Sequence, residues 1–322
     1  QNIVVTGSIS VDDANLLSGT TTGTVTASIT TTETVDSLLN LAGTNAYTIV
    51  ISSEDAAVSS GDLSKINALT TVSIDASAIT ELSGTYAEVT ALYGSAGVDN
   101  LGDEAISISD ALTVTQTNEI DSLTTGVVTA SIATTETVDS LVNLAGTNAY
   151  TIVISSADAT GSTAAEFNTI NALTTIAVDL TNVTSITSSS FDDLETLATA
   201  IGNSEFSNTT GFTTITVSDA AVDATVLAAT IDTYDSINGS GTTLIELSGG
   251  ATINVDAEEV VDMLLDETEN RLNITDQNIV VTGSISVDDA NLLSATTTGT
   301  VTASIVTTES ITAVSYTHLR AH

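Results

Sequence analysis

The sequence predicts an α/β fold: an open solenoid of repeated β-strand plus α-helix units, with a parallel sheet and helices covering one of its faces. Three observations predict it. Long segments of the chain copy one another, and the spacing of apolar residues switches from a strand period to a helix period within each copy. In addition, no proline occurs in the 322 residues, which suits a continuous hydrogen-bonded array.

The copies are nearly identical. Residues 1–29 recur at 277–305 with a single difference, and residues 23–53 recur at 126–156 with 28 of 31 positions identical. The offsets between copies are therefore 276 and 103 positions. Such fixed spacing is the signature of a tandem-repeat array.

Each copy contains short segments with the pattern of a β-strand. Apolar residues alternate there with threonine, serine or other residues, which gives one apolar face and one mostly hydroxyl face. The apolar residues of two such segments are Val25, Ala27 and Ile29, and Tyr47, Ile49 and Ile51.

Segments with a helical period follow the strands. Val35, Leu38, Leu39 and Ala42 are spaced at i, i+3, i+4 and i+7, and Gly43 is expected to end that helix. The same spacing recurs at Phe191, Leu194, Leu197 and Ile201, after a Ser190 cap and before Gly202. A strand, a crossover helix and two loops fit a unit of about 24 residues.

About 12 such strand–helix units are expected in residues 1–313. Their strands are predicted near residues 3, 24, 47, 71, 104, 126, 150, 175, 213, 243, 278 and 299. The intervals after about 71, 175, 213 and 243 are longer, and we interpret them as insertions or irregular units. Successive strands should pair in parallel through right-handed connections. The alternative is a series of β-sandwich domains of about 100 residues, which would match the offset of 103.

The last nine residues, 314–322, resemble a translated sequencing adapter, and we exclude them from the fold. Both histidines and one basic residue lie in this tail. Residues 1–313 therefore contain 41 acidic residues against two basic ones, Lys65 and Arg271, a net charge of −39. We expect these residues to be a fragment of a larger protein.

The strong negative charge argues against two classes of partner. Nucleic acids and anionic lipids are bound by clustered lysine and arginine, which this chain lacks. No apolar run approaches the roughly 18 residues that a membrane span requires. Neighbouring repeats of the same chain are the expected contacts, with surface glycans as a further class of partner.

Two recurring phrases carry a resemblance to known proteins: TTGVVTASIATTETVDSLVNLAGTNAYTIVIS at 124–155 and INALTTVSIDASAITELSG at 66–84. They resemble the Thr/Ala/Asp-rich tandem-repeat regions of giant secreted, adhesin-like cell-surface proteins of marine cyanobacteria and other marine bacteria. The resemblance implies an extracellular location and a role in adhesion or surface architecture. Such proteins often carry calcium-binding glycine-rich nonapeptides as well, but that motif is absent from this sequence.

The residue types needed for nucleophilic catalysis are missing from residues 1–313, which contain no histidine or cysteine. We therefore predict no enzymatic activity, no catalytic residue and no required cofactor. Calcium is the one ion considered, because carboxylate oxygens are abundant. The weak candidates are the acidic pairs Asp12 and Asp13, and Asp288 and Asp289. Each pair follows a serine at an expected helix start, where capping explains the carboxylates equally well.

Two functions remain open at this point. The first is a structural spacer, stalk or adhesive repeat region of a secreted cell-surface protein. The second is a glycan- or calcium-binding module that uses the open Thr/Ser/Asp face of the sheet.

Overall fold

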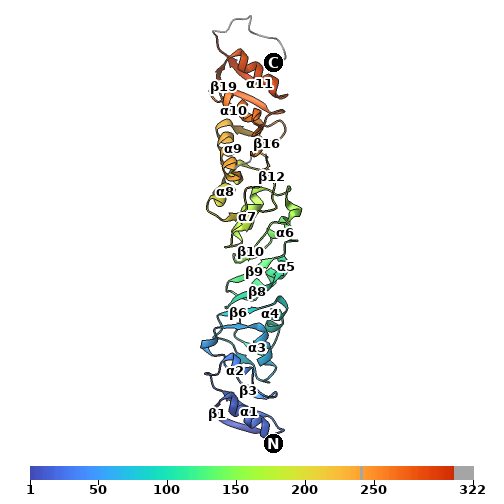
Figure 1. The fold of residues 1–322 in the computed structure, drawn as a ribbon, viewed down its shortest axis with the longest axis vertical. Coiled ribbons are helices and arrows are strands. Elements are labelled where there is room, and N and C mark those ends of the chain that lie inside the picture. Colours follow the sequence, from blue (N-terminus) through green and yellow to red (C-terminus); the bar gives the residue numbers. More distant parts are fainter. Residues whose placement is uncertain (240–241, 308–322) are drawn as a thin grey trace. The chain divides into compact units, whose positions relative to one another are not determined.

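The computed structural model describes residues 1–239 and 242–307 and has an α/β fold. Its chain forms two compact units, each of which is described by itself (Figure 1). Unit 1 comprises Gln1–Glu136, Asn143–Ile152 and Leu173–Ile176. Unit 2 comprises Thr137–Val142, Val153–Ala172 and the chain from Ala177 onward. The tail at 314–322 lies outside the described residues.

Unit 1 contains three parallel sheets. The first, in order, is β1 (Ile3–Ile9), β2 (Val25–Ile29) and β3 (Ala46–Thr48). The second is β4 (Ala57–Ser59), β6 (Glu81–Gly84), β8 (Ala105–Leu112), β9 (Val128–Ile132) and β10 (Ala149–Thr151). The third is β5 (Ile74–Asp75) and β7 (Val98–Asp99).

Unit 2 also contains three parallel sheets. One pairs β11 (Val178–Asp179) with β13 (Phe206–Ser207). Another is β12 (Ser185–Ser189), β14 (Thr214–Val217), β16 (Leu244–Leu247) and β18 (Leu272–Asn273). The last is β15 (Ala221–Asp223), β17 (Thr252–Asp256), β19 (Asn278–Ile285) and β20 (Val301–Ile305).

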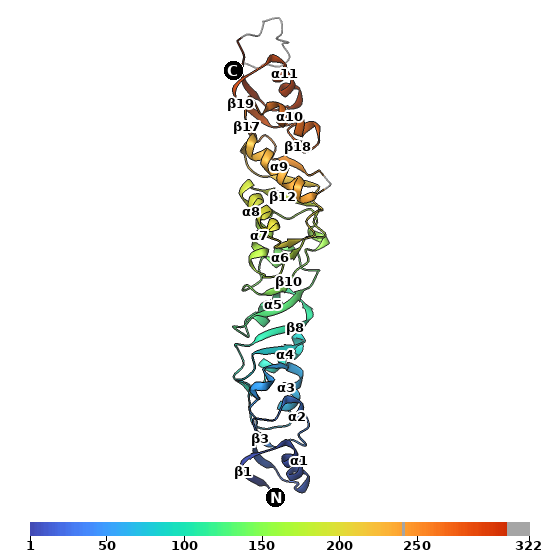
Figure 2. The same cartoon turned by 60° about the vertical axis from the view of Figure 1, so that its left-hand side comes forward.

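Most helices of each unit pack against the next helix in the sequence, beside the strands (Figures 1 and 2). In unit 1 they are α1 (Val11–Thr20), α2 (Val35–Leu38), α3 (Ser60–Asn67), α4 (Tyr86–Tyr93) and α5 (Val114–Asp121), with a 3₁₀ turn at Ser53–Asp55. In unit 2 they are α6 (Val138–Leu141), α7 (Ala164–Ala172), α8 (Phe191–Gly202), α9 (Ala224–Asn238), α10 (Val260–Thr268) and α11 (Val287–Thr296), with a 3₁₀ turn at Ser156–Asp158.

The α/β class predicted from the sequence is confirmed. All strand pairs among the described residues are parallel, which rules out antiparallel β-sandwiches there. The separation in sequence between two paired residues ranges from that of Thr26 and Ala46 to that of Ala221 and Thr252. We call the stretch of chain between one strand and its paired successor a coil.

The prediction of a single sheet was wrong, because the strands are divided among several sheets. The longer intervals that were interpreted as insertions or irregular units are coils that contain more than one strand. For example, β5 pairs with β7 while β6 pairs with β8 within the same two coils. Several of these extra strands have only two to four residues, too few to show an alternating pattern.

The helix expected to extend from Val35 to Ala42 was also predicted too long. It ends at Leu38, because backbone groups beyond it form hydrogen bonds with a side chain of the preceding coil. The Asn15 side chain accepts a hydrogen bond from the Ala42 amide at 2.7 Å and donates one to the Asn40 carbonyl at 2.8 Å. In contrast, α8 begins after Ser190, as predicted, and extends by one residue beyond its predicted end to include Gly202.

Buried or half-buried threonines connect successive coils at the first residue of a Thr-Thr pair. Thr70 and Thr174 donate hydrogen bonds from Oγ1 to the carbonyls of Tyr47 and Tyr150, at 2.6 and 2.7 Å. The same Oγ1 accepts the amide two residues later, at 3.1 Å in both copies. Equivalent bonds are made by Thr21, Thr124 and Thr297, and we call these five residues the threonine clamps.

Three of the clamps are followed by a glycine because two backbones meet there. A Cβ atom at Gly126 would overlap the carbonyl oxygen of Glu104, and one at Gly299 would overlap that of Gln277. Gly23 has the same relation to Gln1. The repeated Thr-Thr-Gly motif is therefore a packing motif between coils.

We predict that Thr174→Val lowers the free energy of unfolding by about 1–3 kcal/mol, because the buried Tyr150 carbonyl and the Ile176 amide both lose a partner. Thr175→Val is the matched control. Thr175 is exposed, and its substitution removes only a 3.3 Å bond from Oγ1 to the Asn148 carbonyl, which still accepts the Thr175 backbone amide at 2.8 Å. Denaturant midpoints measure both changes, and equal effects of the two substitutions would contradict the clamp.

Candidate functional site

The acidic pairs considered for calcium lie at helix N-termini, in separate units. Ser10 caps α1 by accepting the Asp13 amide at 3.1 Å and donating to the Asp13 carboxylate at 2.9 Å. Ser286 caps α11 in the same way, with distances of 3.0 and 2.6 Å to Asp289. Both arrangements are the serine cap expected of a helix start.

The first member of each pair, Asp12 or Asp288, is exposed in the first turn of its helix. In residues 1–239 and 242–307, no group of three or more aspartate, glutamate, histidine or cysteine side chains could hold a metal ion. The structure thus gives these four carboxylates a position at helix starts, where they complement the helix dipole.

Other carboxylates cap helices in the neighbouring coil, a role that the sequence analysis missed. In each case the first helical amide donates a hydrogen bond to an Asp or Glu of the following coil. The pairs are Val11 with Glu33 (3.0 Å), Val35 with Asp55 (2.9 Å), Tyr86 with Asp110 (3.2 Å), Val138 with Asp158 (3.1 Å) and Phe191 with Asp219 (2.9 Å). These carboxylates therefore join one coil to the next.

Two buried Asn–Tyr pairs repeat in the copied segments. Asn45 Oδ1 accepts the Val25 amide of the preceding coil at 2.9 Å, and its Nδ2 contacts the Tyr47 hydroxyl at 3.1 Å. Asn148 and Tyr150 repeat these contacts, with 2.8 Å to the amide of Val128 and 2.9 Å between the side chains. Burial raises the pKa of Tyr150 to about 12 and also raises that of Tyr47, so both remain neutral hydrogen-bonding groups at physiological pH.

A groove of about 640 Å³ lies on unit 2 where β14, β16 and β18 end. Polar side chains line it, including Ser188, Thr216, Glu246, Asn273, Asp276 and Gln277. Gln277 is 1% exposed, and its Nε2 donates to the Asp276 carboxylate, while Oε1 has no hydrogen-bond partner. Glu104 occupies the equivalent position in unit 1. Its carbonyl accepts a hydrogen bond from Thr124, as the Gln277 carbonyl does from Thr297. Glu104 also has one buried side-chain oxygen without a partner.

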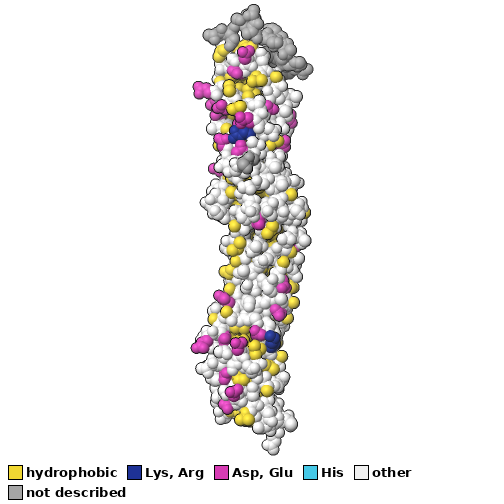
Figure 3. All heavy atoms as spheres, viewed as in Figure 1, with side chains coloured by type: hydrophobic (Ala, Val, Ile, Leu, Met, Phe, Trp, Pro, Cys, Tyr) yellow, Lys and Arg dark blue, Asp and Glu magenta, His cyan; other side chains and the backbone are white. Residues whose placement is uncertain are grey.

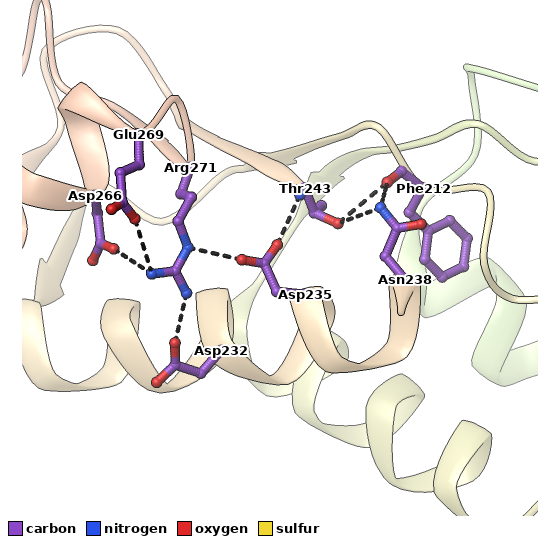
Figure 4. A network of polar contacts seen from close by, with 8 residues as sticks. All are labelled: Phe212, Asp232, Asp235, Asn238, Thr243, Asp266, Glu269 and Arg271. Carbon is purple, nitrogen blue, oxygen red and sulfur yellow. Dashed lines mark hydrogen bonds and ion pairs between the residues drawn. The ribbon is translucent and has the colours of Figure 1, made fainter. Parts of the chain in front are cut away.

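Arg271 joins α9 to α10 and β18 through the densest ion-pair network among the described residues (Figure 4). Its guanidinium lies 2.6 Å from Asp232, 2.7 Å from Asp235 and 2.8 Å from Asp266. Asp235 also accepts the Thr243 amide at 2.8 Å. The guanidinium is therefore engaged by the protein's own carboxylates and is a structural cross-link.

Acidic side chains are scattered over the visible face of each unit, whereas basic side chains form only isolated spots (Figure 3). Lys65 is the second cation among the described residues, and it bonds to Asp62 at 2.7 Å. None of the described helices combines the length and apolar content that crossing a bilayer requires.

Comparisons with protein-family models, with curated proteins and with solved structures found no match for the chain. The function must therefore be inferred from the sequence and from the geometry of the fold. What the geometry offers is a set of repeated contacts between coils and one polar groove.

We predict that Arg271→Met lowers the free energy of unfolding by about 2 kcal/mol at neutral pH, because it leaves Asp235 and Asp266 poorly hydrated and without their cation. Lys65→Met, which removes the exposed ion pair with Asp62, should cause no measurable change. Thermal unfolding of both variants measures the difference.

The Arg271→Met effect should depend on pH. Burial raises the pKa of the Asp266 carboxyl in the folded protein, and Arg271 opposes this rise. Without the arginine that pKa rises further, so the folded variant binds a proton more tightly than the unfolded chain. The variant's deficit should be largest near pH 7 and shrink as the pH falls toward about 4, through the raised pKa of Asp266. A deficit that grows on acidification would contradict this assignment.

Proposed function

We propose that this chain is a structural spacer or stalk, built as a solenoid of stacked coils, in a secreted bacterial cell-surface protein. The observation that carries the proposal is that residues shared by the copies make the same contacts between coils. The threonine clamps, the Asn–Tyr pairs and the carboxylates that cap the neighbouring coil's helices are all of this kind. Repeat arrays are stabilised by such nearest-neighbour contacts.

The acidity supports the same role. A net charge of −38 keeps a long repeat protein hydrated and discourages self-association in most orientations. The extracellular, adhesin-like setting rests on the sequence resemblance. Neighbouring repeats are the proposed partners, and neither catalysis nor a cofactor is part of the proposal.

The polar groove favours a second function, a binding module for calcium or for a hydroxyl-rich ligand such as a surface glycan. Its lining combines carboxylates, amides and hydroxyls, and the residues that line it include no aromatic side chain. Glu246 and Asp276 would supply the charged oxygens.

The spacer proposal predicts an extended particle in solution. A compact protein of 313 residues would have a radius of gyration of about 20 Å. We expect small-angle scattering at moderate salt to give a clearly larger value, because stacked coils add length rather than width. A radius of gyration equal to that of the compact protein would overturn the extended stalk.

The binding module predicts stabilisation by its ligand. With calcium as the probe, a site with a dissociation constant of about 10 µM would gain about 2.7 kcal/mol at about 1 mM calcium. Asp276→Asn should abolish that shift, whereas Asp12→Asn, in unit 1, should preserve it. Thermal melts with calcium and with chelator that coincide would argue against calcium at this groove.

A further inference from the structure

The polar groove of unit 2 carries two carboxylates that are not paired with a cation of the described chain. Glu246 lies on β16, and Asp276 lies in the turn between β18 and β19. Arg271 is the one basic side chain among the described residues of unit 2, and its ion pairs are with other carboxylates. The groove therefore has a negative charge that attracts cations.

A carboxylate at the same register position in unit 1 is held by the protein itself. Asp75 has the place in β5, paired with β7, that Glu246 has in β16, paired with β18. Asn100, in the next coil, donates to the Asp75 carboxylate at 2.9 Å, and the Ser77 amide donates to it at 3.1 Å. Within residues 1–239 and 242–307, Glu246 receives only a 3.5 Å contact, from Asn273. Its carboxylate is thus able to accept a donor from outside the chain.

The buried amide of Gln277 is a second, independent sign of a ligand. Gln277 lines the groove and is 1% exposed. Its Nε2 donates to Asp276, whereas its Oε1 accepts no hydrogen bond from the described part of the chain. A buried acceptor without a donor is destabilising. A ligand donor in the groove would satisfy this oxygen after a rotation of the Gln277 amide toward it.

The hydrogen bonds already made in the groove indicate what kind of ligand it takes. Hydroxyls that donate to neighbouring oxygens of the protein are those of Ser248 (2.9 Å), Thr275 (2.8 Å) and Thr298 (3.0 Å). Most of the unused groups are carboxylate and amide oxygens, which accept hydrogen bonds. A ligand with N–H donors and a positive charge matches them, and an acidic ligand would be repelled.

The size of the groove favours an organic ligand over a single ion. Its volume of about 640 Å³ lies within the range of small-molecule pockets, about 300–1,000 Å³. The hydroxyls of Ser188 and Thr216 line the same groove, and each can accept or donate a hydrogen bond. Such groups suit the hydroxyls of a sugar, so charge and hydroxyl groups together fit a sugar with an ammonium group.

We propose that the groove binds an amino sugar whose amine is free and protonated. The proposal rests on the binding module described above and names its ligand class. Glu246 and Asp276 attract the ammonium group, and the Gln277 oxygen accepts one of its hydrogens. Ser188 and Thr216 contact the hydroxyls of the sugar.

The experiment compares two probes that differ in charge. Calorimetry on the full chain is done with the trisaccharide of glucosamine, at a pH where its amines are protonated, and with the fully N-acetylated trisaccharide. We expect the first to bind and the second to bind at least about tenfold more weakly, because it lacks the charge-assisted hydrogen bonds. Added salt should weaken the binding of the charged trisaccharide.

Three variants connect the binding to the groove. Glu246→Gln should weaken binding of the glucosamine trisaccharide at least about tenfold. Glu258→Gln is the matched control, since it removes the same charge from an exposed residue of unit 2 outside the groove and should change binding by less than about twofold. Gln277→Glu should tighten binding, and the buried Glu104 at the equivalent position of unit 1 shows that the fold accepts a glutamate there. Thermal melts of the three variants check that each is folded.

Other outcomes overturn the amino-sugar assignment. Equal binding of the two trisaccharides would show that the ammonium group is not recognised, while the groove would still be a glycan site. Binding of spermidine, a polyamine without hydroxyls, in the absence of sugar binding would assign the groove to polyamines. A melting shift with calcium and none with either sugar would assign it to calcium.

Failure of the binding module itself has a different result. If neither trisaccharide, spermidine nor calcium binds or shifts the melting temperature, both the amino-sugar assignment and the binding module are overturned. The scattering experiment tests the spacer separately, so that proposal does not depend on the groove.

Discussion

Hydrogen bonding between the strands of successive coils is the constraint on which both units depend. Strands of two to eight residues cannot persist alone in water, and each satisfies its backbone only through the coils beside it. The threonine clamps and the Asn–Tyr pairs extend this dependence to side chains. A single coil is thus an incomplete structure, and repetition completes it.

The stacking of coils also explains the structural role of several acidic residues. Several helices present their first amides to the next coil, and a carboxylate from that coil accepts the hydrogen bond. A carboxylate in that position stabilises the helix start of its neighbour. Among the described residues, only at Arg271 does a basic side chain gather several carboxylates. An acidic composition is therefore compatible with dense packing and needs no bound ion to explain it.

Residues with a long local pattern were predictable, and residues whose role is set by the neighbouring coil were not. The alternation in Val25–Ile29 predicted β2, and Ser190 with the spacing that follows predicted α8 from its cap to within one residue of its end. The short strands β5 and β7 carry no such pattern. The end of α2 was missed because Asn15, in the preceding coil, binds the backbone that would have continued the helix.

The candidate sites follow the same rule, since only those set by a local pattern were predictable. Asp13 and Asp289 were placed correctly at helix starts by the serine before them, whereas the groove beside Gln277 was invisible because its walls come from several coils.

The sequence by itself determined the α/β class, the repeat lengths and the apolar face of the longer strands, because these depend on residues within one turn or one strand. Only the tertiary structure decided how the strands are divided among sheets. Within the same two coils, β5 pairs with β7 whereas β6 pairs with β8. The physical reason is that a strand's sheet is set by the strand beside it, and in a parallel coil that strand comes from a different repeat.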